Sequence, residues 1–341
     1  MATTAVWGSL KHGEHKRHRP HGQHKRHRPH KRHKRIKHRS HRHAARGHRT
    51  KRHKRRKHHP PSSSSSTTPS TPTPATGPTT PSPVTAPGSS PGKIQHVAWI
   101  WMENHGYNNV IGSSSAPYIN SLASTYGLAT NYFATDHPSL PNYIEATTGG
   151  SQGVSDDNSP PANVTSAPSI FSQLPNGQSR SLMEDMPANC YTSNSGNYAV
   201  RHNPEAYLSS VSGDCSNYDV PFGSSPDLSA KFTFITPNVI DDMHDGTVAD
   251  GDNFLKRYVP QLMATPPYQA GNTVIFIVWD EDGLDQNNHV PCIVISPYTH
   301  SVRDGTPYTH YSLLRTAEQL LGLPLLGNAA SANSMLGRFG F

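Results

Sequence analysis

The chain of 341 residues contains no long hydrophobic run and only three cysteines. No apolar stretch approaches the roughly 18 residues that a membrane-spanning helix needs, so the sequence predicts no transmembrane segment. The first ten residues, MATTAVWGSL, are too short and too weakly apolar for a signal peptide of about 15–30 residues. Either the protein is not exported, or the true start lies upstream, or the signal has been removed. The number and spacing of the cysteines do not indicate a zinc–thiolate site.

Acidic residues are almost missing from the first part of the chain. Residues 11–59 hold 22 of the 31 Lys and Arg residues and 15 of the 23 histidines, but a single acid, Glu14. From Lys93 to the end, 9 Lys and Arg residues stand against 22 Asp and Glu residues. The chain therefore joins a basic arm with a net charge near +21 to an acidic body near −13.

The basic arm also lacks the apolar residues of a folded core. It begins with a tandem repeat, HGEHKRHRP at 12–20 and HGQHKRHRP at 21–29, and Ile36 is its one large aliphatic residue. Such a segment cannot offset its ordering entropy, so we expect residues 1–59 to be disordered. Its charge favours polyanions such as a cell-wall polymer, anionic lipid or nucleic acid, bound without sequence specificity because no folded nucleic-acid motif is present.

Residues 60–92 contain no charged residue, and Pro, Ser and Thr dominate them. This composition predicts an extended spacer. Similar stalks are common between an envelope-attached segment and an exported domain, so we expect a secreted or cell-envelope-associated protein. The remaining residues, 93–341, are long enough for one domain with a single core.

Apolar runs alternate with helical patterns in the body. This alternation predicts an α/β fold, a three-layer α/β/α sandwich with a mostly parallel central sheet. Residues 150–228 are rich in Gly, Ser, Asn and Pro and are interpreted as long loops or an inserted cap. Strands are predicted at 95–102, 231–236, 273–279 and 292–296, and helices at 116–126, 140–148, 248–263 and 311–321.

Acidic clusters follow three of these predicted strands. They are Glu103-Asn104-His105, the segment 241–245 (DDMHD) and Asp280-Glu281-Asp282. In an open α/β sheet, ligands bind beyond the carboxyl ends of the strands, where these clusters would meet. Because three acidic groups at one edge repel each other, we expect one or two divalent cations among them. Carboxylate and imidazole ligands suit zinc, manganese, calcium or iron.

A serine stands at the start of a predicted helix, in the segment 137–143 (HPSLPNY). A helix start favours an anionic phosphoryl group, because its N–H groups are free and its dipole end is positive. There Ser139 is a candidate nucleophile if a metal lowers the pKa of its hydroxyl. The alternative is that Ser139 is only the N-cap of the helix.

The three cysteines divide into a pair and a single residue. Cys190 and Cys215 lie in the polar, loop-rich middle, where a disulfide would supply order that a thin core cannot. We predict that disulfide, and it supports an oxidising compartment. Cys292 lies in an apolar strand and is predicted to be a buried thiol.

Together these motifs resemble the bacterial phosphoesterase family that includes secreted acid phosphatases and phospholipases C, within the alkaline phosphatase superfamily. The resemblance covers nearly all of residues 95–327, and its motifs occur in the order of the family. They are HVAWIWMENHGYNNVIG (96–112), APYINSLA (116–123), HPSLPNYIEATTG (137–149), RHNP (201–204), DDMHDG (241–246), VWDEDG (278–283) and HYSLLRTAEQLLGLP (310–324).

The resemblance implies a role for each matching residue. One metal site is formed by Glu103, Asn104, Ser139, Asp280 and Glu281, in which Ser139 is also the nucleophile. Asn104 and Asn142 would bind the phosphate oxygens, and His137 and His202 would contact the phosphate or the leaving group. Glu103 stands where many superfamily members carry Asp, and Glu281 stands where they carry His. A second metal site, or its vestige, would use Asp242, His244 and His310.

The resulting expectation is a metal-dependent phosphoric ester hydrolase. We favour a phosphomonoesterase of the acid phosphatase type, and one that resembles a phosphatidylinositol-3-phosphatase is included in this class. The reaction would pass through a phosphoseryl intermediate on Ser139. The substrate would be a small-molecule or lipid phosphate ester. One alternative is a phospholipase C or another phosphodiesterase on the same site, and a second is a non-enzymatic polyanion-binding surface protein. A sulfatase is disfavoured, because the sequence has no Cys/Ser-x-Pro-x-Arg motif.

Overall fold

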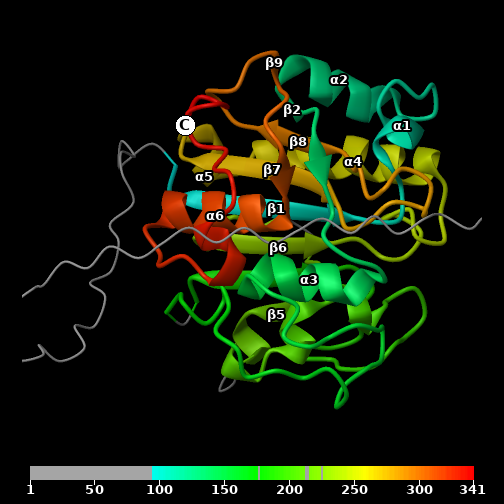
Figure 1. The fold of residues 1–341 in the computed structure, drawn as a ribbon, viewed down its shortest axis with the longest axis vertical. Coiled ribbons are helices and arrows are strands. Elements are labelled where there is room, and N and C mark those ends of the chain that lie inside the picture. Colours follow the sequence, from blue (N-terminus) through cyan, green and yellow to red (C-terminus); the bar gives the residue numbers. More distant parts are fainter. Residues whose placement is uncertain (1–93, 176, 212–214, 224–225) are drawn as a thin grey trace, which may run out of the picture. The chain divides into compact units, whose positions relative to one another are not determined.

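The computed structural model describes residues 94–341, except 176, 212–214 and 224–225 (Figure 1). The arm predicted at 1–59 and the spacer predicted at 60–92 lie outside these residues. Within the described part, no helix is long and apolar enough to cross a membrane.

An eight-stranded sheet forms the centre of the body, in the order β5-β4-β6-β1-β7-β8-β2-β9. Strand β1 lies in its middle and is parallel to both neighbours, β6 and β7. Every residue of β7 is buried, as its continuous apolar run TVIFIVW requires. The strands are β1 (His96–Met102), β2 (Gly127–Ala129), β4 (Ser179–Met183), β5 (Asp219–Pro221), β6 (Phe232–Thr236), β7 (Thr273–Trp279), β8 (Cys292–Ile295) and β9 (Val302–Asp304).

Helices cover the two faces of this sheet. Trp101 of β1 contacts Tyr143 and His310, which belong to helices on one face. The next residue, Met102, points to the opposite face, where it lies beside Gly251 of another helix. The helices are α1 (Tyr107–Val110), α2 (Pro117–Thr125), α3 (Ser139–Thr148), α4 (Val248–Met263), α5 (Pro266–Gln269) and α6 (His310–Leu321).

The helices pair within their layers: α3 packs against α6, and α2 packs against α4 (Figure 1). The pairs α3–α6 and α2–α4, with the sheet between α6 and α4, make up three layers. This arrangement confirms the predicted α/β/α sandwich with a mostly parallel sheet. A separate two-stranded sheet joins β3 (Tyr132–Phe133) to β10 (Tyr308–Thr309), just before α3 and α6 begin.

The structure corrects the sequence interpretation in two places. The segment 150–228 is not all loop or cap, because β4 and β5 extend the parallel sheet at its edge. Alternating Ser and Arg in SRSLM hide the apolar signal of β4. Strand β8 is antiparallel to β7, and β2 is antiparallel to β8, so one half of the sheet is mixed.

The cysteines lie as their environments suggest. Cys190 and Cys215 form a disulfide that closes a loop of 25 residues in the middle segment. Cys292 is a free, buried thiol in β8.

The tryptophans Trp99 and Trp101 are fully buried and pack with Phe234 of β6 in the core.

Candidate active site

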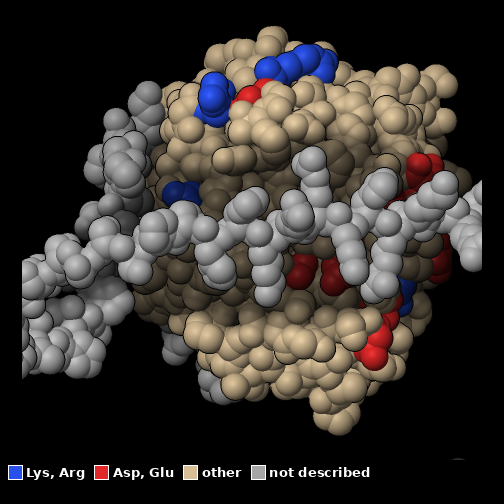
Figure 2. All heavy atoms as spheres, viewed as in Figure 1, with Lys and Arg blue, Asp and Glu red and all other residues tan. Residues whose placement is uncertain are grey.

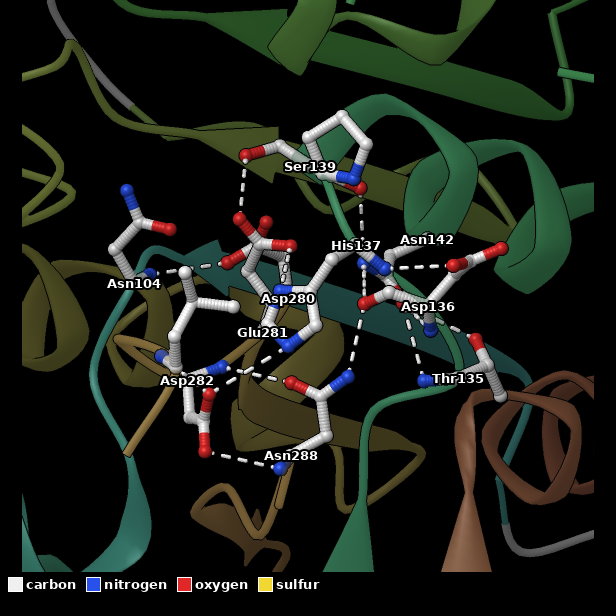
Figure 3. A network of polar contacts seen from close by, with 12 residues as sticks. Asn104, Thr135, Asp136, His137, Ser139, Asn142, Asp280, Glu281, Asp282 and Asn288 are labelled. Carbon is white, nitrogen blue, oxygen red and sulfur yellow. Dashed lines mark hydrogen bonds and ion pairs between the residues drawn. The ribbon is translucent and has the colours of Figure 1, made fainter. Parts of the chain in front are cut away.

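The acidic clusters meet at one edge of the sheet. Glu103 directly follows β1 and Asp280 directly follows β7, and the two strands are paired up to Met102 and Trp279. The backbone N–H of Asn104 donates to Asp280 Oδ1 at 3.1 Å (Figure 3). Asp242, after β6, joins the same edge, because its carbonyl accepts from the Glu103 N–H at 2.9 Å.

Glu103 lies at the centre of this group and is fully buried. Its Oε1 accepts a hydrogen bond from the hydroxyl of Tyr143, on α3. Its Oε2 accepts from Ser139 Oγ at 3.2 Å. His202 Nε2 lies 3.3 Å from Glu103 Oε1. Helix α3 and the turn at His202 therefore present polar groups to one carboxylate at the end of β1.

Ser139 is the first residue of α3, and the helix makes no N-cap hydrogen bond through a side chain. Its Oγ points at two carboxylates instead, Glu103 and Glu281, the latter at 3.4 Å from Oε1. The N–H of Leu140 is occupied by Asp157 Oδ1 at 2.9 Å, so this part of the helix start is already bonded to a carboxylate. The N-cap alternative is therefore not what the structure shows.

His137 approaches the site from the turn before α3. Its Nδ1 lies 2.7 Å from Glu281 Oε2, and its Nε2 lies 3.6 Å from Asp282 Oδ1 (Figure 3). Asp282 itself accepts from three backbone N–H groups of the loop that follows. The loop is thus held in shape by Asp282, while the Glu281 carboxyl points toward Ser139 and His137.

The two asparagines differ in what their side chains do. Asn142 is buried, and its Oδ1 accepts from the N–H groups of Thr135 and Asp136 and from the Thr135 hydroxyl. Its amide donates to the carbonyls of Asp136 and Pro138. These bonds hold the turn that carries His137, so Asn142 positions the site rather than presenting a donor to phosphate. The side chain of Asn104 lies outside these bonds (Figure 3).

A second group of ligands lies on the other side of Glu103. Glu103, His202 and His244 each offer one ligand atom, and the three atoms lie within 4.8 Å of one another. Asp242 Oδ2 lies 3.0 Å from His202 Nδ1, and Asp242 Oδ1 accepts from the His244 N–H. The structure thus places His202, predicted to contact substrate, with the residues predicted for a second metal site.

His310 is not brought into that group. Its Nε2 lies 2.7 Å from the backbone carbonyl of Asp280, and its Nδ1 lies 3.0 Å from the hydroxyl of Tyr132. Both ring nitrogens are therefore engaged, and His310 fixes the end of β7 from the start of α6. The prediction that His310 binds a second metal is not supported by this arrangement.

Sequence reasoning missed Arg201 as a site residue. Its Nη2 lies 2.9 Å from His244 Nε2, and its Nε lies 3.8 Å from Asp157 Oδ2. Through Asp157 it reaches the first turn of α3, next to Ser139. The signal was present in the RHNP motif, where Arg201 is one of nine basic residues in a body with 22 acids.

Burial shifts the pKa of four of the buried groups that meet here, Glu103, Asp280, Glu281 and His202. It raises the pKa of Glu103 well above its usual value, and the charges of Asp280 and Asp242 raise it further. Burial also raises the pKa of Asp280 to about 6 and, with the Asp280 charge, that of Glu281 to about 9. Burial, Arg201 and His244 lower the pKa of His202. The carboxyls therefore need protons or a cation between them.

The chemistry of these donors fits a divalent metal ion. Asp280 Oδ2 and His202 Nε2 are buried and have no hydrogen-bond partner among the residues that the structure describes. Buried carboxylates, imidazoles and a hydroxyl at one edge form a set that accepts zinc, manganese or iron. A serine at a helix start, facing carboxylates that could hold a metal ion at the end of a parallel sheet, is an arrangement that suits the hydrolysis of anionic esters.

Comparison with known proteins identifies the family. The sequence profile of the Phosphoesterase family matches residues 101–324, so the chain belongs to this family. It is 34% identical over 248 residues to the phosphatidylinositol-3-phosphatase of Mycobacterium tuberculosis, a match that covers 70% of this chain and 80% of that protein. The predicted family is confirmed, and the chain is a phosphoric ester hydrolase.

Other relatives are longer or share only the fold. The phosphate-repressible acid phosphatase of Penicillium chrysogenum is 28% identical over 254 residues, which cover 67% of this chain and 59% of that protein. A solved structure from a study of glycosaminoglycan metabolism by Bacteroides thetaiotaomicron has a TM-score of 0.50 at 12% identity, covering 73% of this chain and 82% of that one. It shares the fold.

Proposed function

We propose that this phosphoric ester hydrolase is a metal-dependent phosphomonoesterase of the acid phosphatase type, with Ser139 as its nucleophile. One observation carries the proposal: the Ser139 hydroxyl, on the first residue of a buried helix, lies between the carboxylates of Glu103 and Glu281. A serine in that position can lose its proton to the carboxylate group as it attacks.

The proposed reaction has two steps: transfer of the phosphoryl group to Ser139, and hydrolysis of the phosphoserine. Ser139 Oγ forms a bond to phosphorus while the ester P–O bond breaks, and the alcohol leaves with a proton. Water then attacks the phosphoserine, which releases phosphate and returns the proton to Ser139. His137 lies beside the Glu281 carboxylate, next to Ser139, where its ring can hold or donate a proton.

Glu103, Asp280 and Glu281, with Asn104 and Ser139, would hold a divalent metal ion on the nucleophile side. Glu103, His202 and His244, whose ligand atoms lie within 4.8 Å of one another, would hold a second one, and Asp242 would hold His202 in position through its Nδ1. A bound metal would lower the pKa of the Ser139 hydroxyl and stabilise negative charge on the phosphoryl oxygens. Arg201 adds a fixed positive charge beside His244, which favours the dianion of a phosphomonoester.

The substrate class follows from the relatives as a proposal. The Mycobacterium tuberculosis relative is named for phosphatidylinositol 3-phosphate and the fungal relatives for acid phosphatase activity. We expect a small-molecule or lipid phosphate ester here. The disulfide supports an oxidising compartment, which agrees with a secreted or envelope-associated location.

The test is turnover of a chromogenic aryl phosphate by the full chain. Ser139→Ala should lower kcat by at least about 10³-fold, because it removes the nucleophile. Ser121→Ala, at an exposed serine of α2, is the matched control and should retain activity. Chelation with EDTA should also reduce turnover, and added metal should restore it. Full activity in Ser139→Ala would refute the nucleophile.

Two alternatives have their own outcomes in this assay. A phospholipase C or another phosphodiesterase would cleave a chromogenic diester faster than the matching monoester. A non-enzymatic polyanion-binding protein would show no metal-dependent turnover of either substrate. The monoester preference that we propose requires a higher kcat/KM for the monoester, measured with both compounds under the same metal conditions.

A further inference from the structure

A carboxylate from a surface loop reaches the start of α3, beside the candidate nucleophile. Asp157 belongs to the segment between α3 and β4, and its Oδ1 accepts from the N–H of Leu140 at 2.9 Å. Leu140 directly follows Ser139 in the first turn of the helix. The other oxygen of Asp157, Oδ2, lies 3.8 Å from Arg201 Nε. The negative charge of Asp157 is therefore held by a helix-start N–H and a guanidinium.

These two donors are the kind that bind an anionic phosphoryl group. An N–H at a helix start and an Arg guanidinium are both common donors to phosphate oxygens. Ser139 Oγ and the Leu140 N–H belong to adjacent residues, so a phosphoryl group that Ser139 attacks comes close to this N–H. A carboxylate and a phosphoryl group both present oxygens that share negative charge. Asp157 and a substrate would therefore need the same donors.

Asp157 lies in a site that is already acidic. Ser139 Oγ faces the carboxyls of Glu103 and Glu281 at 3.2 and 3.4 Å. A further carboxylate beside Ser139 is repelled by these two when they are charged. The helix start and Arg201 offset this repulsion, as they would for the phosphoryl group of a substrate.

Arg201 is not bound firmly to Asp157. The 3.8 Å between Arg201 Nε and Asp157 Oδ2 is longer than an N–H···O hydrogen bond. The guanidinium is held from its other side, where Nη2 lies 2.9 Å from His244 Nε2. The exposed fractions of the side chains are 21% for Arg201 and 34% for Asp157, so water reaches both. Arg201 can therefore donate to another anion without leaving His244.

The loop that carries Asp157 can release it without opening the core. Residues 155–168 include no buried residue. The neighbouring Asp156 holds the loop by itself, because its Oδ1 accepts from Asn163 Nδ2 at 2.6 Å. A segment with few buried contacts opens at a low cost in free energy. Turning the Asp157 carboxyl away from Leu140 breaks one hydrogen bond and one long ion pair.

We propose that the Leu140 N–H and Arg201 bind a phosphoryl oxygen of the substrate, and that Asp157 occupies this place until the substrate displaces it. The inference rests on the proposed function, because it concerns the phosphoryl group that Ser139 attacks. Asp157 acts as an internal competitor, which lowers the apparent affinity for any phosphate anion by the fraction of molecules in which the place is taken. The same competition favours release of the product phosphate.

The test is the Kd of the metal-loaded full chain for inorganic phosphate, measured by isothermal titration calorimetry, which requires no turnover. Asp157→Ala should lower this Kd about 10-fold, because the Leu140 N–H and Arg201 are then free. The same substitution in an Arg201→Ala background should lower Kd by less than about 3-fold, since one of the shared donors is missing.

Asp157 also bonds the first turn of α3, so a second variant keeps the test decisive if Asp157→Ala folds poorly. Asp157→Asn removes the charge and keeps an oxygen for the Leu140 N–H, and it should still lower Kd about 3-fold or more. Asp156→Asn is the matched control. It removes the same charge from the neighbouring residue, keeps an acceptor for Asn163, and should leave Kd within about 2-fold of the parent value.

Three results would overturn the inference. A phosphate Kd that is unchanged or higher in Asp157→Ala and Asp157→Asn would show that Asp157 caps the helix or orients Arg201. An equal fall in Kd for Asp156→Asn would assign the effect to overall charge. The third result is the absence of phosphate binding by the metal-loaded chain and its variants. The proposed nucleophile is tested separately, because Ser139→Ala is scored by turnover and keeps both donors.

Discussion

At the scale of single residues, the candidate site depends on which side chains are free and which are already bonded. Asn142 and His310 are committed to hydrogen bonds that shape the turn before α3 and the end of β7. Ser139, Glu281 and His137 face one another, and Glu103 joins them through Ser139 (Figure 3). Ser139, Glu281, His137 and Glu103 are therefore the candidates for the chemistry, and Asn142 and His310 hold the surrounding backbone in place.

Arg201 is expected to set the preference for phosphomonoesters. Arg201→Ala should lower kcat/KM for an aryl monoester about 10–100-fold and lower that for the diester less, because the dianion loses more attraction than the monoanion. Arg303→Ala, at an exposed arginine of β9, is the control and should retain both rates. Equal losses on both esters would show that Arg201 acts on the structure of the site, not on substrate charge.

Glu318 should make stability depend on pH. Burial raises the pKa of this α6 carboxyl from its usual 4.5 to about 8. The unfolded chain loses this proton near pH 4.5 and the folded chain keeps it until about pH 8, so the free energy of unfolding falls as pH rises between these values.

Glu318→Gln removes this titration and keeps an oxygen for the Leu326 N–H, which Glu318 Oε1 accepts at 3.0 Å. The variant should therefore melt at a higher temperature than the parent, by a margin that grows between pH 5 and pH 8. Melting curves at several pH values measure this margin. A constant margin across that range would contradict the raised pKa.

At the scale of elements, helix α3 carries Ser139 at its start, and its last turn packs against the backbone at Leu326. Gly149 ends the helix with φ of +79°, and a Cβ there would lie 2.3 Å from the Leu326 carbonyl oxygen. Both the backbone conformation and the close approach require glycine.

Gly149→Ala should therefore destabilise the protein by at least about 2 kcal/mol, since strain at positive φ adds to a clash with backbone. Gly153→Ala is the matched control: its φ is +82°, but nothing lies within 4 Å of the added Cβ. It should cost about 1 kcal/mol. Denaturant unfolding gives the free energy of unfolding of both variants. Equal losses of that free energy would mean that the backbone at Leu326 moves away from the added Cβ without destabilising the protein.

At the scale of the whole molecule, charge divides the chain into an acidic body and a basic arm. Figure 2 shows Lys and Arg atoms mainly along the upper edge of the body, with acidic atoms in the shaded middle and at the right of the same face. The arm lies outside the residues that the structure describes, and its role rests on its sequence. The enzyme and its anchoring to a surface are expected to be separable functions.

A truncated chain that begins at Lys93 should keep the aryl phosphatase kcat of the full chain and lose binding to polyanions. The full chain should bind an anionic cell-wall polymer or DNA with an affinity that falls steeply with salt, because the arm releases counterions. Binding should strengthen from pH 7.5 to pH 5.5 as the 15 histidines of the arm become charged. Equal polyanion binding by both chains would refute this role.

The sequence alone was enough to predict the α/β class, the sheet strands β1, β6 and β7, and the acidic clusters that follow them. These features can be read from short segments of sequence. A buried parallel strand is a continuous apolar run, and the first polar or acidic residue after the run shows where the strand ends. Helix α4 was predicted with the bounds that the structure shows, because its helical pattern stops before Pro266 and Pro267. The structure adds a capping box at its start, formed by Thr247 and Asp250.

Tertiary structure decided what depends on pairing between distant segments. The place of β4 between β5 and β6, the antiparallel direction of β8 and the commitment of His310 to the Asp280 carbonyl have no local pattern. Short elements carry weak periodicity, and a polar side chain shows its role only when its partner is known. Local chemistry thus determined which residues could react, and long-range packing determined which of them meet at the candidate site.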